Sequence, residues 1–367
     1  MTTTTTAVDG SPADGPDLPF LRVRDLSVRF ATEDGEVRAV DSLSFDLHRG
    51  RTLGIVGESG SGKSVTSLAL LGLHDPARST VTGSAVLEGT ELVGADERTL
   101  RPLRGRRMAM VFQDALTALS PYYPVGEQIA ESYRRHTGAG RKAAAERAVE
   151  MLARVGIPSP RSRAGDYPHQ FSGGMRQRAM IAGALVCDPD LLIADEPTTA
   201  LDVTVQAQIL ELLADLQQEF HTSIILITHD LGVIAGCAHD VLVMYAGRCA
   251  EYGGTEQVLT QPQHPYTAGL LASVPRLTGD PGQPLLPVPG SPPSLLAVPS
   301  GCAFHPRCGS RALVAGTACT EQRPELTSVG PADGAHRAAC HLDSAQRRTL
   351  APELPPLADA LPEGIAP

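Results

Sequence analysis

The sequence predicts an α/β fold built around a sheet with parallel strands. From Leu21 to about Tyr252, segments with the pattern of strands alternate with segments with the pattern of helices, which is typical of α/β domains. Three short apolar runs, TLGIVG (52–57), LLIADE (191–196) and SIILIT (223–228), have the composition of strands buried on both faces. These runs indicate the centre of a parallel sheet that helices cover on both sides.

The other elements follow from periodicity and capping residues. The segment VRAVDSLSFDL (37–47) alternates with period two and predicts a further strand of the core sheet. Residues 141–155 predict a helix that ends at Gly156, with Pro158 beyond it. Asp202 is placed to cap another helix. The apolar faces of the two helices are Ala145, Ala148, Val149, Leu152 and Val155 in the first, and Val205, Ile209, Leu212, Leu213, Leu216 and Phe220 in the second.

The composition is that of a globular chain without excess positive charge. The 367 residues are 42% hydrophobic and 20% charged, with a formal net charge of −10, which argues against a nucleic-acid partner. The N-terminus lacks the basic start and apolar stretch of a secretion signal, and we find no run of 18 apolar residues. We therefore expect a cytoplasmic protein that associates with a membrane only through a partner.

The character of the sequence changes past residue 260. Residues 281–301 hold many prolines and predict an extended linker. The seven cysteines are unevenly spread, and four of them, Cys302, Cys308, Cys319 and Cys340, lie in the tail. We predict a disordered arm at 1–18, a main domain at 19–260, a C-terminal extension at 261–345 and a disordered tail at 346–367.

The stretch GESGSGKS (57–64) fits the phosphate-loop pattern G-x-x-x-x-G-K-[ST] and directly follows a predicted strand. Backbone N–H groups in such a loop surround phosphate at a helix N-terminus, where the dipole favours an anion. The pattern predicts that Lys63 reaches the β- and γ-phosphates and that the Ser64 hydroxyl binds Mg²⁺. The alternative is an accidental match in a glycine-rich turn. The predicted nucleotide-binding residues are Gly57, Glu58, Ser59, Gly60, Ser61, Gly62, Lys63 and Ser64.

Polar residues follow three other predicted strands. In LLIADEP (191–197), Asp195 can hold Mg²⁺ and Glu196 can polarise the water that attacks a γ-phosphate. Gln113 in MVFQD is either a Mg²⁺ ligand or solvent-facing, and His229 in ITHD is either catalytic or structural. Strand ends of this kind face the ligand crevice of an α/β sheet. A further stretch, FSGGMRQR (171–178), has a serine and glycines suited to an anion at the start of a helix.

In this order, the motifs resemble those of the ATP-binding cassette ATPases over about 230 residues. The resemblance implies a RecA-like core with an antiparallel β subdomain and a helical subdomain that carries the signature sequence. FSGGM stands where that family has LSGGQ, so Phe171 and Met175 depart from the pattern while Ser172, Gly173 and Gly174 keep its centre. By the same resemblance Gln113 is the Q-loop residue and Asp202 of TALD is the D-loop aspartate. His229 is the switch histidine that contacts the γ-phosphate, and Phe30 of LSVRF is the aromatic residue that stacks on adenine.

A second set of motifs resembles the ATPase subunits of oligopeptide, dipeptide and nickel importers. These motifs are VFQDALTALSPYYPVGEQI (111–129), QHPYT (263–267) and the cysteine tail. The resemblance implies a peripheral ATPase on the cytoplasmic face of the membrane, paired head to tail with a second ATPase. That partner is a second copy or a paralogue, and we expect a paralogue. It also implies two permease subunits and an extracellular substrate-binding protein. Peptide is the expected substrate, nickel or another small solute is the alternative, and a soluble ATPase acting on nucleic acid or ribosomes is a third reading.

The four tail cysteines are spaced C-x5-C, C-x10-C and C-x20-C, none of which is the close C-x-x-C of a zinc ribbon. Four thiolates in so short a segment can carry a [4Fe–4S] cluster, and GCAFHPRC and AACHL resemble the flanks of such a site in some peptide importer ATPases. Zinc with help from His305, His336 or His341, or free thiols, remain alternatives. The expected cofactors are thus ATP with Mg²⁺, and a [4Fe–4S] cluster.

Overall fold

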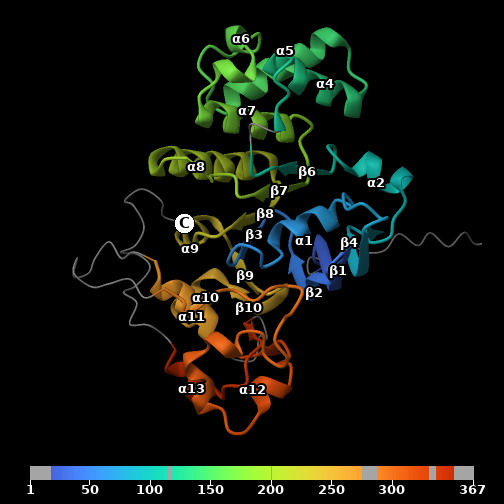
Figure 1. Cartoon of the computed structure of the whole chain (residues 1–367). Coiled ribbons are helices and arrows are strands. Elements are labelled where there is room, and N and C mark those ends of the chain that lie inside the picture. The colour runs from blue at the N-terminus through green and yellow to red at the C-terminus, as the bar shows by residue number, and fades with distance from the viewer. Residues whose placement is uncertain (1–17, 115–117, 200, 275–286, 330–335, 351–367) are drawn as a thin grey trace, which may run out of the picture.

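The computed structural model describes residues 18–114, 118–199, 201–274, 287–329 and 336–350. The predicted arm and most of the predicted tail therefore lie outside the described residues. Figure 1 shows a helical layer at the top, two sheets in the middle and the C-terminal extension at the bottom. Within the described residues, no helix is both long enough and apolar enough to cross a membrane.

The larger sheet has eight strands in the order β11-β12-β10-β9-β3-β8-β7-β6. The strands β6, β7, β8, β3 and β9 run parallel to one another, whereas β10 is antiparallel to β9. Every residue of β3, β7 and β8 is buried. This confirms the three apolar runs as the centre of a parallel sheet. The bounds are β3 Thr52–Val56, β6 Met108–Val111, β7 Leu191–Asp195, β8 Ser223–Thr228, β9 Asp240–Tyr245, β10 Arg248–Gly254, β11 Thr327–Ser328 and β12 Arg337–Ala338.

The smaller sheet is antiparallel and contains the strand that we had placed in the core sheet. Its order is β2-β1-β4-β5, so the prediction for residues 37–47 was right about the strand and wrong about its sheet. The physical reason is the short connection between Thr32 and Gly35, because a tight hairpin joins only antiparallel strands. The bounds are β1 Leu21–Thr32, β2 Gly35–Leu47, β4 Ser79–Leu87 and β5 Thr90–Glu91.

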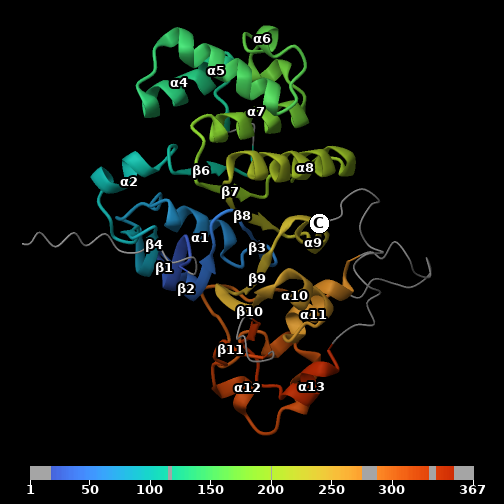
Figure 2. The same cartoon turned by 180° about the vertical axis from the view of Figure 1, so that it is seen from behind.

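Helices cover the larger sheet and form the separate layer above it, as Figures 1 and 2 show from opposite sides. In α5 the buried face contains Ala144, Ala148, Met151 and Leu152, whereas Ala145 is exposed, so the predicted face was rotated in part. The helix ends before Gly156, which has the predicted left-handed conformation. The bounds are α1 Lys63–Leu70, α2 Glu97–Leu103, α4 Val125–Thr137, α5 Arg141–Arg154, α6 Pro160–Arg163, α7 Gly173–Leu185, α8 Val203–Phe220 and α9 Leu231–Cys237.

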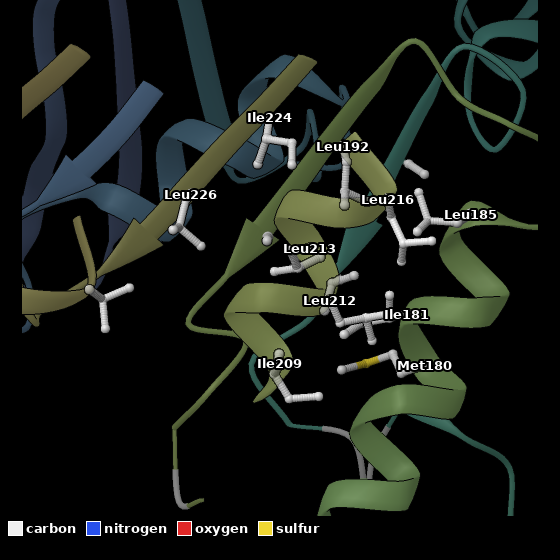
Figure 3. Packing of buried hydrophobic residues seen from close by; sticks show 14 of the residues in the cluster. Met180, Ile181, Leu185, Leu192, Ile209, Leu212, Leu213, Leu216, Ile224 and Leu226 are labelled. Atoms are coloured by element: carbon white, nitrogen blue, oxygen red, sulfur yellow. The ribbon is translucent and has the colours of Figure 1, made fainter. Parts of the chain in front are cut away.

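The main core lies between α7, α8 and the sheet. In Figure 3, Met180 and Ile181 of α7 point towards Leu212 and Leu213 of α8, and Leu192 of β7 closes the cluster. The side chain of Asp202 accepts a hydrogen bond from the Val205 backbone N–H at the start of α8, as predicted. This packing fixes the helix that follows the acidic strand end relative to the helix that starts at Ser172.

The C-terminal extension continues the larger sheet. Its strand β12 pairs with β10, and β11 pairs with β12. Residues 287–301 contain no helix or strand, as expected for the linker. Helix α13 runs past residue 345, where we had expected the extension to end, because Asp343 caps it and the side chain of Arg347 donates to the Cys340 carbonyl. The bounds are α10 Thr255–Thr260, α11 Pro265–Ala272, η2 His305–Arg307, η3 Gly309–Leu313, α12 Ala318–Glu321 and α13 Ser344–Arg348; a further 3-10 turn, η1, is Pro168–Gln170.

Candidate functional site

The phosphate loop lies between β3 and α1 and is packed closely against two other strands. Gly57, Gly60 and Gly62 have φ values of 155°, 78° and 103°. A Cβ atom on Gly57 would lie 2.2 Å from the Met244 carbonyl oxygen, and one on Gly62 would lie 2.3 Å from the Ala39 carbonyl oxygen. Only glycine fits these two positions, so the backbone of β9 and β2 fixes the path of the loop.

Lys63 is buried beneath this loop. Its Nζ donates to the carbonyl oxygens of Gly57 at 2.8 Å and Glu58 at 3.1 Å, and the residue is 5% exposed. Burial lowers the pKa of the Lys63 ammonium, while the carboxylates of Glu196, Asp195 and Glu58 raise it. The ammonium therefore sits within reach of the acidic strand end.

Residues from three strand ends converge on one carboxylate. Gln113 follows β6, Glu196 follows β7 and His229 follows β8, and these parallel strands present their carboxyl ends at the same edge of the sheet. The Gln113 Nε2 donates to the Glu196 Oε2 at 2.9 Å, and the His229 Nδ1 lies 3.6 Å from the same oxygen. The sequence predicted that these residues lie at the ligand-facing edge of the sheet, and in the structure Gln113 and His229 both lie next to the Glu196 carboxylate.

Thr199 is a member of this cluster that the sequence analysis missed. Its hydroxyl donates to the Glu196 Oε2 at 2.8 Å. Glu196 itself has a left-handed backbone with φ of 46°, and its N–H donates to the Ile227 carbonyl at 2.8 Å. A left-handed conformation in a glutamate carries strain, which the surrounding contacts must hold. The sequence did contain an indication of this contact, because Thr199 stands three residues after Glu196, a spacing at which its hydroxyl can reach the Glu196 carboxylate across a turn.

Asp195 offers an unsatisfied oxygen beside the phosphate loop. It is 4% exposed, and its Oδ1 has no hydrogen-bond partner within the described residues. Burial raises the pKa of the Asp195 carboxyl, and the Ser64 hydroxyl, by hydrogen bonding to it, lowers that pKa. A buried carboxylate oxygen, a hydroxyl and the nearby Gln113 amide are oxygen donors of the kind that Mg²⁺ takes. The residues present therefore fit this ion.

Phe30 lies in β1 of the small sheet. It is half-buried and pairs across β1 and β2 with Val37, so both side chains lie on the same face. Its ring packs edge-on against His74, with the ring centroids 5.3 Å apart.

The signature residues stand apart from this cluster. Ser172 accepts a hydrogen bond from the Met175 N–H at 3.3 Å and begins α7, as the sequence predicts. A Cβ atom on Gly174 would lie 2.8 Å from a Val205 methyl group, so the first turn of α7 packs against the first turn of α8. Figure 1 shows α7 in the helical layer and α1 in the layer below it. Ser172 and Asp202 are both exposed.

The four tail cysteines gather in the extension. The Cys302 N–H donates to the Cys319 carbonyl at 2.9 Å. Burial, together with a smaller effect of charge on the neighbouring cysteine thiols, raises the pKa of the Cys302 and Cys308 thiols to about 11. Nevertheless, across the described ranges no three His, Cys, Asp or Glu side chains are arranged to hold a metal ion. The expected [4Fe–4S] ligand set is therefore not preformed here.

The histidines considered for zinc are engaged elsewhere. A ring nitrogen of His305 lies 2.9 Å from the Cys302 carbonyl oxygen, and one of His341 lies 2.8 Å from the Gln322 carbonyl oxygen. His336 is paired with buried Glu251 at 2.8 Å. These contacts give the zinc alternative no support.

Comparison with known proteins matches this chain and its fold to one class of protein. The family described as ABC transporter matches residues 40–199. Among solved structures, the ATP-binding cassette MJ0796 in a dimeric state bound to ADP and Pi aligns with a TM-score of 0.58 at 24% identity, covering 64% of this chain and 98% of that one. CbiO1 of Clostridium perfringens, part of the ABC transporter complex CbiONQ, aligns with a TM-score of 0.55 at 27% identity, covering 65% of this chain and 90% of that one. The class is thus an ATP-binding cassette.

Closer relatives narrow the class. The family described as Oligopeptide/dipeptide transporter, C-terminal region matches residues 250–312. The oligopeptide transport ATP-binding protein OppD of Haemophilus influenzae is 55% identical over 290 residues, which cover 79% of this chain and 89% of that one. The dipeptide transport ATP-binding protein DppD of Bacillus subtilis is 52% identical over 295 residues, covering 80% and 88%. The chain belongs to the ABC transporter family, among its oligopeptide and dipeptide transport ATP-binding proteins.

Proposed function

We propose that this chain is the ATP-hydrolysing subunit of a membrane importer for dipeptides or oligopeptides. The observation that carries the proposal is the convergence of Gln113, Thr199 and His229 on Glu196, beside the loop that buries Lys63. Relatives that are named for oligopeptide and dipeptide transport support the peptide substrate. Peptide passes through two permease subunits, which hold this chain at the cytoplasmic face of the membrane.

The residues divide the work of hydrolysis. The phosphate loop and Lys63 bind the phosphates, and Phe30 stacks on adenine. Glu196 takes a proton from water as the water oxygen bonds to the γ-phosphorus and the bond to the bridging oxygen of ADP breaks. His229 contacts the γ-phosphate. Thr199 orients the carboxylate through its hydroxyl.

Magnesium would be held by Ser64, Gln113 and Asp195. The buried Asp195 oxygen without a protein partner supports this assignment. When bound, Mg²⁺ neutralises charge on the β- and γ-phosphates.

The signature residues form half of a second site. We infer that Ser172, Gly173 and Gly174 contact the γ-phosphate held by a partner ATPase, and that Asp202 lies at the same interface. The exposure of Ser172 and Gly173 at the start of α7, away from this chain's own phosphate loop, supports the inference. A helix N-terminus with an open serine suits an anion that arrives from outside the chain. The partner is a paralogue, so the ATPase pair is a heterodimer, and an extracellular binding protein delivers the substrate.

The extension, which we place from residue 261 to the end of α13 at Arg348, would carry a [4Fe–4S] cluster on Cys302, Cys308, Cys319 and Cys340. The support is the chemistry of the donor set, four cysteines in which charge on the other three raises the pKa of the Cys302 thiol. Because no ligand set is preformed in the described residues, the thiols would have to come together when the cluster binds.

The proposal is tested by Glu196→Gln in the assembled importer. The variant keeps the size of the side chain but cannot accept a proton. We expect this subunit's site to lose hydrolysis while ATP binding is retained. Undiminished turnover at this site would show that Glu196 is not the catalytic acid–base residue.

A further inference from the structure

The C-terminal extension reaches the phosphate loop through one buried arginine. Arg307 closes the 3-10 turn η2, directly before Cys308, and lies 249 residues from Glu58 in the sequence. Its Nη1 donates to the Glu58 Oε2 at 2.6 Å, and its Nη2 donates to the Glu58 Oε1 at 2.9 Å. The pair is therefore bidentate, the geometry in which an arginine fixes both the distance and the orientation of a carboxylate.

The guanidinium is held on its other sides as well. It donates to the carbonyl oxygens of Pro289 at 2.7 Å, Val288 at 3.3 Å and Gly290 at 3.3 Å, all in the linker. The side chain of Arg307 is 6% exposed, whereas that of Glu58 is 25% exposed. The hydrogen bond with Glu58 raises the pKa of Arg307, so its charge is permanent. A buried arginine with this many partners is a rigid anchor rather than a surface contact.

A second contact holds the backbone of the same loop residue. The Glu58 N–H donates to the Tyr266 hydroxyl at 2.9 Å, and Tyr266 is fully buried in the segment QHPYT. Its ring packs against Tyr245 and Phe304, with centroid distances of 4.6 and 5.4 Å. The side chain and the amide of Glu58 are thus both bound to residues beyond 260.

The linker also borders the loop on its open side. A cavity of about 290 Å³ lies between residues 58–61 and residues 292–296, with Val37 at its edge. Val37 is the cross-strand partner of Phe30. The extension therefore contacts the phosphate loop at Glu58 through Arg307, and its linker lines a cavity beside residues 58–61 of the loop.

We propose that the C-terminal extension sets the affinity for ATP, with Arg307 and Tyr266 as positioning residues for the phosphate loop. This inference rests on the proposed function, because it assumes that the loop binds ATP. Loop amides bind phosphate only when their N–H groups point inward together. Two fixed contacts on Glu58 hold one end of the loop in that arrangement before ATP arrives, which lowers the entropy lost on binding.

The test uses the full chain and compares Arg307→Gln, Glu58→Gln, the double variant and Tyr266→Phe by their Kd for ATP with Mg²⁺. We expect each single variant to raise Kd by about five- to tenfold, since each loses a hydrogen bond that orders the loop. The double variant Arg307→Gln with Glu58→Gln is expected to bind about as weakly as either single variant, because the two residues act as one unit. Exposed Arg348→Gln is the matched control and leaves Kd unchanged.

Two further measurements separate positioning from a general loss of structure. In the assembled importer, Arg307→Gln is expected to raise KM for ATP while kcat at saturating ATP stays near that of the wild type. Arg307→Lys keeps the charge without the bidentate geometry, and it is expected to recover only part of the affinity.

The outcomes distinguish the two proposals. If the wild-type chain does not bind ATP, the proposed function fails. If it binds ATP and folded Arg307→Gln binds equally well, or the two substitutions have independent additive effects, the positioning role is wrong. Should Arg307→Gln not fold, Tyr266→Phe and Glu58→Gln decide, and unchanged affinity in both overturns the inference.

Discussion

The amide of Gln113 donates a hydrogen bond to the carboxylate of Glu196 at 2.9 Å, although the two residues are 83 positions apart. The hydrogen bond joins the residue that follows β6 to Glu196, the proposed catalytic residue. A change in the position of Gln113 would therefore remove one of the contacts that hold the catalytic carboxylate.

We predict that Thr199→Val slows hydrolysis without weakening ATP binding. The substitution removes the hydroxyl that donates to the Glu196 Oε2, so the carboxylate loses one of the contacts that orient it. A loss of one such bond is expected to lower kcat about tenfold. Turnover and Kd for ATP are measured in the assembled importer.

Thr199→Ser is the control, because it keeps the hydroxyl and is expected to retain most of the activity. An unaffected kcat in Thr199→Val would show that this hydroxyl does not orient the carboxylate.

The stability of the chain is predicted to depend on pH through His264. This residue is 3% exposed, and its Nδ1 accepts a hydrogen bond from the Tyr266 N–H. Burial, with a smaller effect of Arg347, lowers its pKa from 6.5 to about 3. In the unfolded chain His264 therefore binds a proton near pH 6.5, whereas in the folded chain it stays neutral down to about pH 3. As pH falls through this window, the free energy of unfolding drops by up to about 1.4 kcal/mol per pH unit.

His264→Asn supplies the comparison, since asparagine also caps helices but does not titrate. Chemical denaturation from pH 7 to pH 4 should show a steeper loss of stability in the wild type than in the variant. Parallel curves would contradict a neutral, buried His264.

The cysteine proposal is tested by metal and sulfide analysis of protein purified without oxygen. We predict about four iron and four sulfide per chain, as a [4Fe–4S] cluster requires, with loss of both in Cys340→Ser. The matched control is Cys237→Ser, which changes a half-buried cysteine in α9. Wild-type protein free of iron would contradict the cluster. Iron that persists in Cys340→Ser would show that Cys340 is not one of its ligands.

The sequence predicted the strand ends of the site because each lies directly next to a local pattern. Gln113, Glu196 and His229 each follow an apolar strand, and parallel strands bring their carboxyl ends together. Lys63 stands in the phosphate-loop pattern that follows β3. The strand at 37–47 was visible for the same reason, but periodicity does not say which sheet a strand joins.

Contacts between distant segments could not be predicted in this way. Buried Arg307 forms an ion pair with Glu58, yet neither residue stands in a sequence pattern that indicates the other. The pairing of β12 with β10 likewise depends on how the extension folds back on the main sheet. The sequence did predict a helix start at Ser172. It does not indicate by itself whether Ser172 contacts the phosphate bound by this chain or the one bound by a partner.

The shared site is the central claim, and Ser172→Arg tests it most directly. The arginine would fill the space expected for the γ-phosphate that the partner binds. The control is Ser344→Arg, which adds the same charge at another exposed helix start, that of α13. ATP hydrolysis is measured in a complex whose partner is the only subunit able to hydrolyse, and ATP binding is measured on the isolated variant. We predict loss of hydrolysis at the partner's loop with unchanged binding at Lys63. Full hydrolysis at the partner's loop, or loss of ATP binding by the isolated chain, would contradict the account.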